Sequence, residues 1–120
     1  MGKILLDSLV SRSSVPLEIP KHGAAPTLVH STLSNVRDFV YLSISNSNTH
    51  DVDVLIRIGA SNAPPMRVRA SGRQYSTCPA LQNRGVGGAV SSVGVYVQLA
   101  TPTNEATTSQ VHITGFVIRS

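Results

Sequence analysis

Four side chains with oxygen ligands lie close together in the middle of the chain and could bind a hard cation. They are Asn46, Asn48, Asp51 and Asp53. Calcium prefers such carboxylate and amide oxygens, but a calcium-binding loop also needs a central glycine and a terminal glutamate. This stretch has neither at the required spacing, so we predict that the chain binds no metal. On a strand, Asp51 and Asp53 would share one outward face, where they would contact water or pair with arginines.

The residue types that catalyse reactions in other proteins are present but scattered. The histidines, none at a ligand spacing such as His-x-x-x-His, are His22, His30, His50 and His112. Cys78 precedes Pro79 and has no adjacent basic residue to favour a reactive thiolate, so we interpret it as a small apolar residue. No serine lies in a Gly-x-Ser-x-Gly motif, and residues 85–88 lack the Gly-Lys-Ser/Thr of a phosphate-binding loop. We therefore predict that the protein is not an enzyme and has no cofactor.

One basic cluster, Arg67, Arg69 and Arg73, stands out in a chain of net charge +4. On a strand, Arg67 and Arg69 would lie on the same face. Sites for single-stranded nucleic acid interleave basic residues with stacking aromatics, and only Tyr75 is close enough to serve here. A solvated strand face is the simplest interpretation of the cluster. Contact with an acidic protein surface is the functional alternative, and we predict no binding to nucleic acid.

The elements that would position these residues are strands, and residues 39–59 contain the clearest pair. Apolar residues alternate with polar ones in both halves of this stretch, at Val40, Leu42 and Ile44 and then at Val52, Val54, Ile56 and Ile58. A period of two predicts half-buried strands. The polar residues 46–50 favour turns, so they should join the two strands as a hairpin or a short arch.

Further alternating segments predict strands at residues 27–33, 66–70, 73–78, 93–99 and 111–118, and the glycine-rich residues 81–92 suggest a flexible loop. The 120-residue chain has no tryptophan and few aromatics, and Val, Ile, Thr and Ser are abundant. A pair of strands cannot bury its apolar face alone, so a second layer is needed. We predict an all-β fold, an antiparallel β-sandwich of jelly-roll-like form.

The first twenty residues differ from the rest, and we assign residues 1–20 to an extended N-terminal arm and residues 21–120 to the β-sandwich domain. Pro16 and Pro20 fix the backbone and remove hydrogen-bond donors, which suits an edge segment or an arm on another surface. An ordinary first strand of the domain's own sheet is the alternative. Residues 5–10 could instead form a short helical stripe, or residues 4–6 a short strand. No apolar run approaches the roughly 20 residues that span a bilayer, and no export signal is visible, so we expect no membrane partner.

A sequence of features in residues 38–120 can be compared with known families. The features are Asp38-Phe39-Val40-Tyr41-Leu42, the turn Ser45-Asn46-Ser47-Asn48, an aliphatic strand ending in Gly59, the strand 93–100, and Gly115-Phe116-Val117-Ile118-Arg119. This order, which covers about two thirds of the chain, resembles small virion structural proteins of tailed bacteriophages. Such proteins are compact β-sandwiches and include head decoration, or cement, proteins. The basic charge and the glycine-rich residues 81–92 depart from the pattern.

The resemblance implies a capsid decoration protein that binds the major capsid protein shell and stabilises the head. Its location would be the virion, on the capsid exterior, after synthesis in the host cytoplasm. A tail or baseplate component is one alternative, and a small carbohydrate- or nucleic-acid-binding β-sandwich module is an alternative of another class. Apolar residues expected on outward faces, Leu55, Phe116 and Ile118, suggest self-association, and we expect a homotrimer. The predicted partner-binding residues are Ile4, Leu5, Leu6, Leu9, Val10, Leu17, Ile19, Arg67, Arg69 and Arg73.

Overall fold

The chain folds entirely into strands and loops within the residues that the computed structural model describes, which are 3–5, 17–72, 74–77, 84–87, 93–103 and 108–119. The strands are β1 (Lys3–Leu5), β2 (Leu17–Glu18), β3 (Thr27–Ser31), β4 (Arg37–Asn46), β5 (Val52–Gly59), β6 (Met66–Ala70), β7 (Gln74–Thr77), β8 (Arg84–Gly87), β9 (Gly94–Leu99) and β10 (Val111–Arg119). The predicted all-β fold is confirmed.

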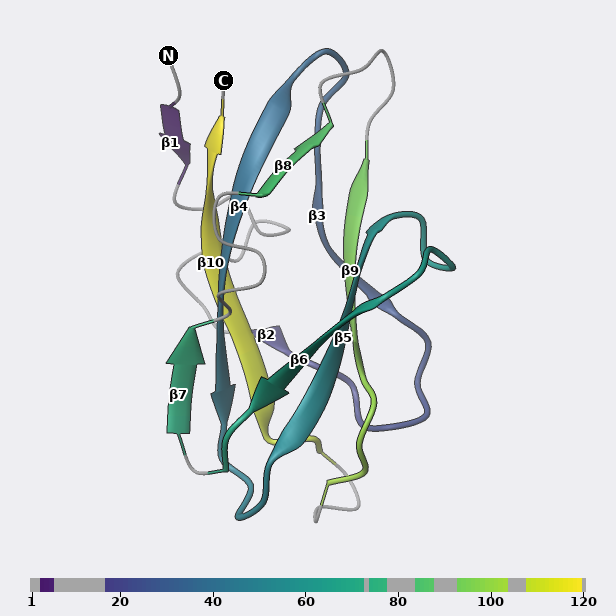
Figure 1. Cartoon of the computed structure of the whole chain (residues 1–120), viewed down its shortest axis with the longest axis vertical. Helices are drawn as coiled ribbons and strands as arrows, with labels where there is room; N and C mark the ends of the chain where they lie inside the picture. Colours follow the sequence, from purple (N-terminus) through teal and green to yellow (C-terminus); the bar gives the residue numbers. More distant parts are fainter. Residues whose placement is uncertain are drawn as a thin grey trace.

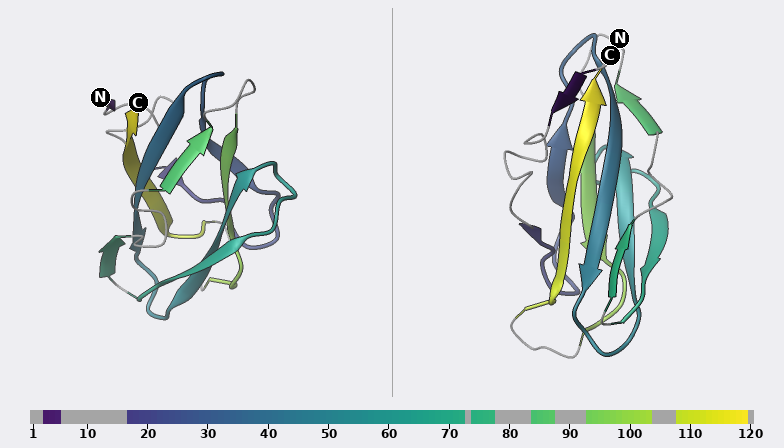
Figure 2. Two further views of the ribbon diagram at one scale, coloured as in Figure 1. Left: turned by 45° about the horizontal axis from the view of Figure 1, so that its top comes forward. Right: turned by 90° about the vertical axis from the view of Figure 1, so that its left-hand side faces the viewer.

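Two antiparallel sheets form the layers of the molecule, seen side by side in Figure 1. The first sheet has the order β1-β10-β4-β7, with β2 also paired to β10 and β8 also paired to β4. The second sheet has the order β3-β9-β5-β6. The right-hand view of Figure 2 looks onto the first sheet and shows β1 and β2 at opposite ends of the same edge of β10. Two stacked antiparallel sheets were expected from the alternating segments, and this expectation is confirmed.

The core lies between the sheets and is built from β-branched and leucine side chains, which suit the half-buried surface of a strand. Its fully buried side chains of largest volume are Ile19, Leu42, Ile44, Ile56, Ile113, Val29, Val40, Val52, Val54, Val95 and Val97. The inward positions of β4 and β5 are those that the alternation predicted. The two strands therefore contribute to one core from opposite layers.

The polar segment between β4 and β5 is an arch, because the two strands belong to different sheets. The Asn46 amide donates to the carbonyls of His50 at 2.9 Å and Ala70 at 3.1 Å. The backbone and side-chain amides of Asn48 both donate to Asn46 Oδ1 at 2.9 Å, and the side chain also donates to the Ser109 carbonyl at 2.8 Å. Of the predicted hairpin and arch, the arch is present, and buried asparagines fix it.

The predicted flexible loop at residues 81–92 is wrong in part, because residues 84–87 form β8 and pair with residues 37–40 of β4. The glycines of β8 allow its backbone to lie close to β4 and to the residue before it. A Cβ at Gly87 would lie 2.6 Å from the Val36 carbonyl oxygen, and its φ of 85° also favours glycine. A Cβ at Gly85 would lie 3.0 Å from Arg37 Cδ and 3.2 Å from Phe39 Cε2.

The described parts of residues 1–20 lie along the edge of the first sheet. β1 and β2 pair antiparallel with the two ends of β10. The Ile19 backbone N–H donates to the Val111 carbonyl at 2.9 Å, and the Ile19 side chain is fully buried. These residues occupy edge positions of the domain's own sheet. The helical stripe considered for residues 5–10 lies outside the described residues after Leu5.

Candidate partner-binding face

The outer face of the second sheet gathers three arginines and one carboxylate on adjacent strands. The register pairs Arg69 with Asp53 and places Leu55 between Arg67 on β6 and Gln98 on β9. It also pairs Arg57 with Tyr96, which in turn pairs with Leu28. Alternate residues of β5, at positions 54 and 56, are buried, so positions 53, 55 and 57 point outward. We call these eight residues the arginine face.

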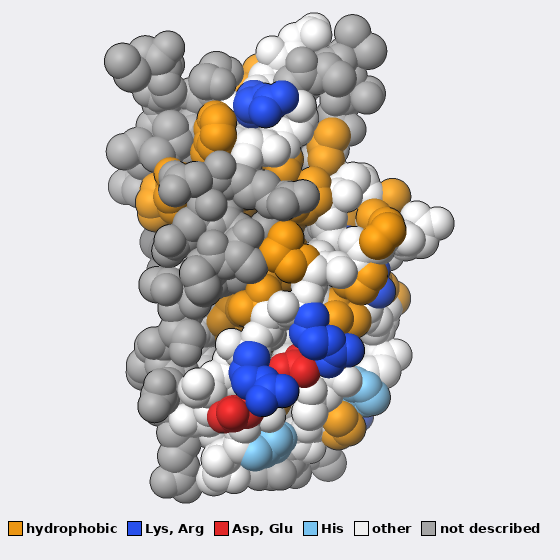
Figure 3. Space-filling view, viewed as in Figure 1, with side chains coloured by type: hydrophobic (Ala, Val, Ile, Leu, Met, Phe, Trp, Pro, Cys, Tyr) orange, Lys and Arg blue, Asp and Glu red, His pale blue; other side chains and the backbone are white. Residues whose placement is uncertain are grey.

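Asp53 links the two arginines of β6. Its carboxylate accepts a hydrogen bond from Arg67 Nη1 at 2.7 Å and from Arg69 Nε at 3.1 Å. Figure 3 shows basic groups on both sides of an acidic group over β6. The Asp53 side chain is only 12% exposed, whereas those of Arg67 and Arg69 are 60% and 69% exposed. The carboxylate is thus largely enclosed, and the guanidinium groups remain accessible to a partner.

The pKa of Asp53 is lowered from its ordinary value of 3.8, chiefly by the hydrogen bond from Arg67 and further by Arg69, while burial opposes the shift. The group is therefore ionised at neutral pH and neutralises one of the two arginine charges. Pairing with arginines was one of the two environments expected for this residue from its outward position, and the geometry confirms it.

This pairing predicts a pH-dependent contribution to stability. A lowered folded-state pKa stabilises the fold above the unfolded value of 3.8, and that stabilisation is lost as the pH falls through the folded-state pKa. We expect the unfolding free energy of the wild type to exceed that of Asp53→Asn by less than about 1 kcal/mol at pH 7, because exposed partners are screened by solvent. Chemical denaturation from pH 7 to pH 2 should show this difference shrinking below pH 4. A difference that stays constant with pH would contradict the assignment.

Arg57 is held by two hydrogen bonds of its own. Its Nε donates to the Ala63 carbonyl at 3.0 Å, and its Nη1 donates to Gln98 Oε1 at 2.6 Å. Gln98 is itself held, because its amide donates to the Ala24 carbonyl at 3.0 Å. Arg57 is therefore fixed beside Tyr96, which makes it a preorganised cation at the centre of the sheet face.

A buried contact between a histidine and an aspartate lies inside the molecule. His30 Nε2 is 2.7 Å from Asp38 Oδ2, and the two residues are 2% and 0% exposed. His30 belongs to β3 in the second sheet and Asp38 to β4 in the first. The pair thus bridges the layers in a site closed to solvent, and we assign it a structural role.

The four oxygen-bearing residues considered for a cation each have hydrogen-bond partners within the protein. Asn46 and Asn48 hydrogen-bond within the arch, and Asp53 pairs with arginines. Asp51 accepts a hydrogen bond from the Gly72 backbone N–H at 2.9 Å. Among the described residues, no three or more His, Cys, Asp or Glu side chains lie close enough together to hold a metal ion.

The predicted partner-binding residues have different environments. Arg67 and Arg69 lie together on the outer face of β6. Ile4 and Leu5 belong to β1, Leu17 is half-buried in β2, and Ile19 is part of the core. The predicted residues outside the described part of the chain are Leu6, Leu9, Val10 and Arg73, and Cys78 lies outside it as well.

Sequence reasoning missed Arg57, Gln98 and Tyr96 as parts of the same surface. Arg57 shares the alternation of Asp53 and Leu55, so its outward direction was predictable. Its neighbours on β9 were not predictable, because strand order and register bring together residues about forty positions apart.

Comparison of the chain with protein-family models, curated proteins and solved structures gave no match. In the described part of the chain, no helix is long and apolar enough to cross a membrane. The function proposed below accordingly depends on strand order, on surface chemistry and on the resemblance noted in residues 38–120.

Proposed function

We propose that the chain is a virion structural protein of a tailed bacteriophage, a head decoration protein with a jelly-roll domain that binds the major capsid protein shell. The observation that carries the proposal is the strand order. If β1 and β2 count as one edge strand and β7 and β8 as another, eight strands form two sheets of four, with the orders β2-β10-β4-β7 and β3-β9-β5-β6. Two Greek keys produce this order in a double-sheet jelly roll, an architecture common among viral capsid domains.

The N-terminal segment supports attachment across subunits. Its described parts lie on one edge of the first sheet, held by three pairs of residues in β1 and two in β2. Only three residue pairs hold β1, so this strand can leave its own sheet for the edge of a neighbouring subunit, while the fully buried Ile19 anchors the segment to the domain. This is the behaviour that the proposed arm requires.

Self-association is supported by the outer face of the first sheet. Phe39, Tyr41 and Phe116 lie there, on adjacent strands, and each is half-buried. Leu33, in the loop after β3, is 57% exposed. Apolar side chains on an outer face favour burial against copies of the same chain, and closed cyclic symmetry is the usual result. We propose a homotrimer at the local three-fold positions of the capsid.

The lectin alternative, which the same architecture also permits, is disfavoured by the aromatic geometry. Tyr41 and Phe116 stack on each other, with ring centroids 4.8 Å apart and planes 7° apart. Each ring therefore uses one face for the other ring, and the pair does not form the flat aromatic platform on which a sugar would stack. Binding of the protein to a glycan array would favour the lectin alternative.

The proposal is tested with phage heads that lack the protein. The wild-type chain should sediment with these heads and raise the temperature at which they release DNA, and sedimentation equilibrium should give three times the chain mass. Deleting residues 2–15 should leave a folded protein whose apparent affinity for heads is at least about tenfold weaker, equal to about 1.4 kcal/mol.

Two outcomes would contradict this account in different ways. If the wild type is a monomer at high concentration and binds no heads, the decoration function is wrong. If the truncated chain binds heads as tightly as the intact one, the role of the N-terminal segment is wrong. Recovery of the protein from purified tails rather than heads would favour the tail or baseplate alternative.

A further inference from the structure

We propose that the arginine face is the docking surface for a carboxylate-rich protein segment. The inference rests on the proposed function, in which this segment belongs to the capsid shell. It adds that the outer face of β5, β6 and β9 in the second sheet binds this partner.

Charge complementarity identifies the partner's chemistry. Three guanidinium groups and one carboxylate leave two positive charges uncompensated on this face. Arg67 and Arg69 each make one hydrogen bond to Asp53 while staying 60% and 69% exposed, so each retains N–H donors for a further acceptor. A guanidinium group matches a carboxylate with two parallel hydrogen bonds.

The cations are also held in place before any partner arrives. Asp53 fixes Arg67 and Arg69 from one side, and Arg57 is fixed by Ala63 and Gln98. Arginine side chains that are already ordered lose less conformational entropy on binding. The face is therefore suited to a defined contact with a partner and not simply to hydration.

The neighbours of the arginines favour protein over nucleic acid. Leu55 and Tyr96 are half-buried beside the charges, and Leu28 is 40% exposed next to Tyr96. Mixed arginine, tyrosine and aliphatic surface is typical of protein interfaces. The enclosed Asp53 carboxylate would repel a phosphate backbone approaching the same arginines, whereas individual carboxylates on a protein can be spaced to avoid it.

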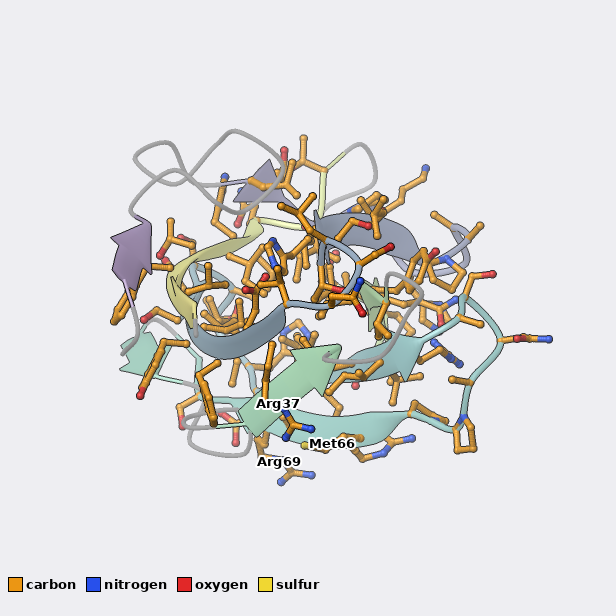
Figure 4. All side chains as sticks on the ribbon, turned by 90° about the horizontal axis from the view of Figure 1, so that it is seen from above. Arg37, Met66 and Arg69 are labelled. Atoms are coloured by element: carbon orange, nitrogen blue, oxygen red, sulfur yellow. The ribbon has the colours of Figure 1, made fainter. Side chains whose placement is uncertain are left out.

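Arg37 provides a matched control elsewhere on the surface. Arg37 is exposed at the start of β4. The opposite end of β4 lies near Arg69, because the Asn46 amide there donates a hydrogen bond to the carbonyl of the adjacent residue, Ala70. The strand is 10 residues long, and extended chain of that length covers about 30 Å. In Figure 4, viewed along the long axis, Arg37 and Arg69 project on the same side from different strands. Loss of either removes the same charge.

The test measures the binding of a fluorescent octaglutamate peptide at low ionic strength by anisotropy, with an oligonucleotide of eight nucleotides as the rival ligand. We expect the wild type to bind the peptide more tightly than the oligonucleotide. Arg67→Ser/Arg69→Ser should weaken peptide binding at least about tenfold, and Arg69→Ser several-fold, while Arg37→Ser should change it by less than about twofold.

A second variant distinguishes loss of binding from loss of folding. Arg67→Ser/Arg69→Ser leaves Asp53 without its partners, so the triple variant with Asp53→Asn removes that unpaired charge and should show the same loss of binding. Thermal melts by circular dichroism confirm folding in each case.

Three results would overturn the inference. They are equal weakening by Arg37→Ser and Arg69→Ser, tighter binding of the oligonucleotide, and no binding of the peptide by the wild type at low salt. The head-binding experiment is separate from this one. If the wild type and Arg67→Ser/Arg69→Ser decorate heads equally, the docking surface is wrong but the decoration function stands.

Discussion

Replacing Asp38 with alanine is expected to lower the free energy of unfolding by about 1 to 3 kcal/mol, the usual cost of removing one partner from a buried hydrogen bond. His30 and Asp38 are almost completely enclosed, and their side chains meet at 2.7 Å between strands of different sheets. Loss of the carboxylate removes the hydrogen bond between His30 Nε2 and Asp38 in a site that is closed to solvent. The two layers should therefore separate more easily at this end of the molecule.

The measurement is urea denaturation of Asp38→Ala beside two companion variants. Asp51→Ala removes an exposed carboxylate and should cost less than about 1 kcal/mol. His30→Ala/Asp38→Ala should cost less than the sum of the two single changes, because the partners interact directly. If Asp38→Ala is no more destabilising than Asp51→Ala, the buried pair does not hold the sheets together.

Replacing Ile56 with alanine should destabilise the protein by about 2 to 5 kcal/mol through loss of apolar burial and creation of a cavity. Ile56 is 1% exposed on β5, opposite the buried side chains of β4. Leu28→Ala removes the same number of carbon atoms from a side chain that is 40% exposed. That control should cost less than about 1 kcal/mol.

Thermal and urea unfolding of the two variants provide the comparison. Equal destabilisation by Ile56→Ala and Leu28→Ala would contradict the assignment of inward and outward positions on the second sheet. It would also contradict the arginine face, because Leu55 and Arg57 are outward only if Ile56 points inward.

The strands with the clearest alternation were predictable from the sequence. β4, β5, β6, β9 and β10 all coincide with period-two segments, and most of the apolar residues predicted to face inward are buried. The physical reason is that a one-residue shift would expose a whole apolar face. The pattern therefore determines which side chains of a strand face the core. β8 was missed because its glycines were interpreted as flexibility, whereas they permit close contact with β4 and with the loop before it.

The pairing and stacking of strands distant in the sequence were less predictable. The sequence left open whether residues 46–50 form a hairpin or an arch, because local turn propensity does not say which sheet the next strand joins. The cluster of Arg67 and Arg69 was visible, but its link to Asp53 depends on the pairing of β5 with β6. The contact of His30 with Asp38 had no sequence signal, since it depends on how the two sheets stack.

The most direct test of the proposed function is a cryo-electron microscopy reconstruction of heads purified from the phage that encodes this chain. We expect density for three copies of the β-sandwich around each local three-fold position on the outer surface. The face formed by β5, β6 and β9 should point toward acidic residues of the shell. Heads that contain no copy of the chain, together with wild-type protein that does not bind them, would contradict the proposal.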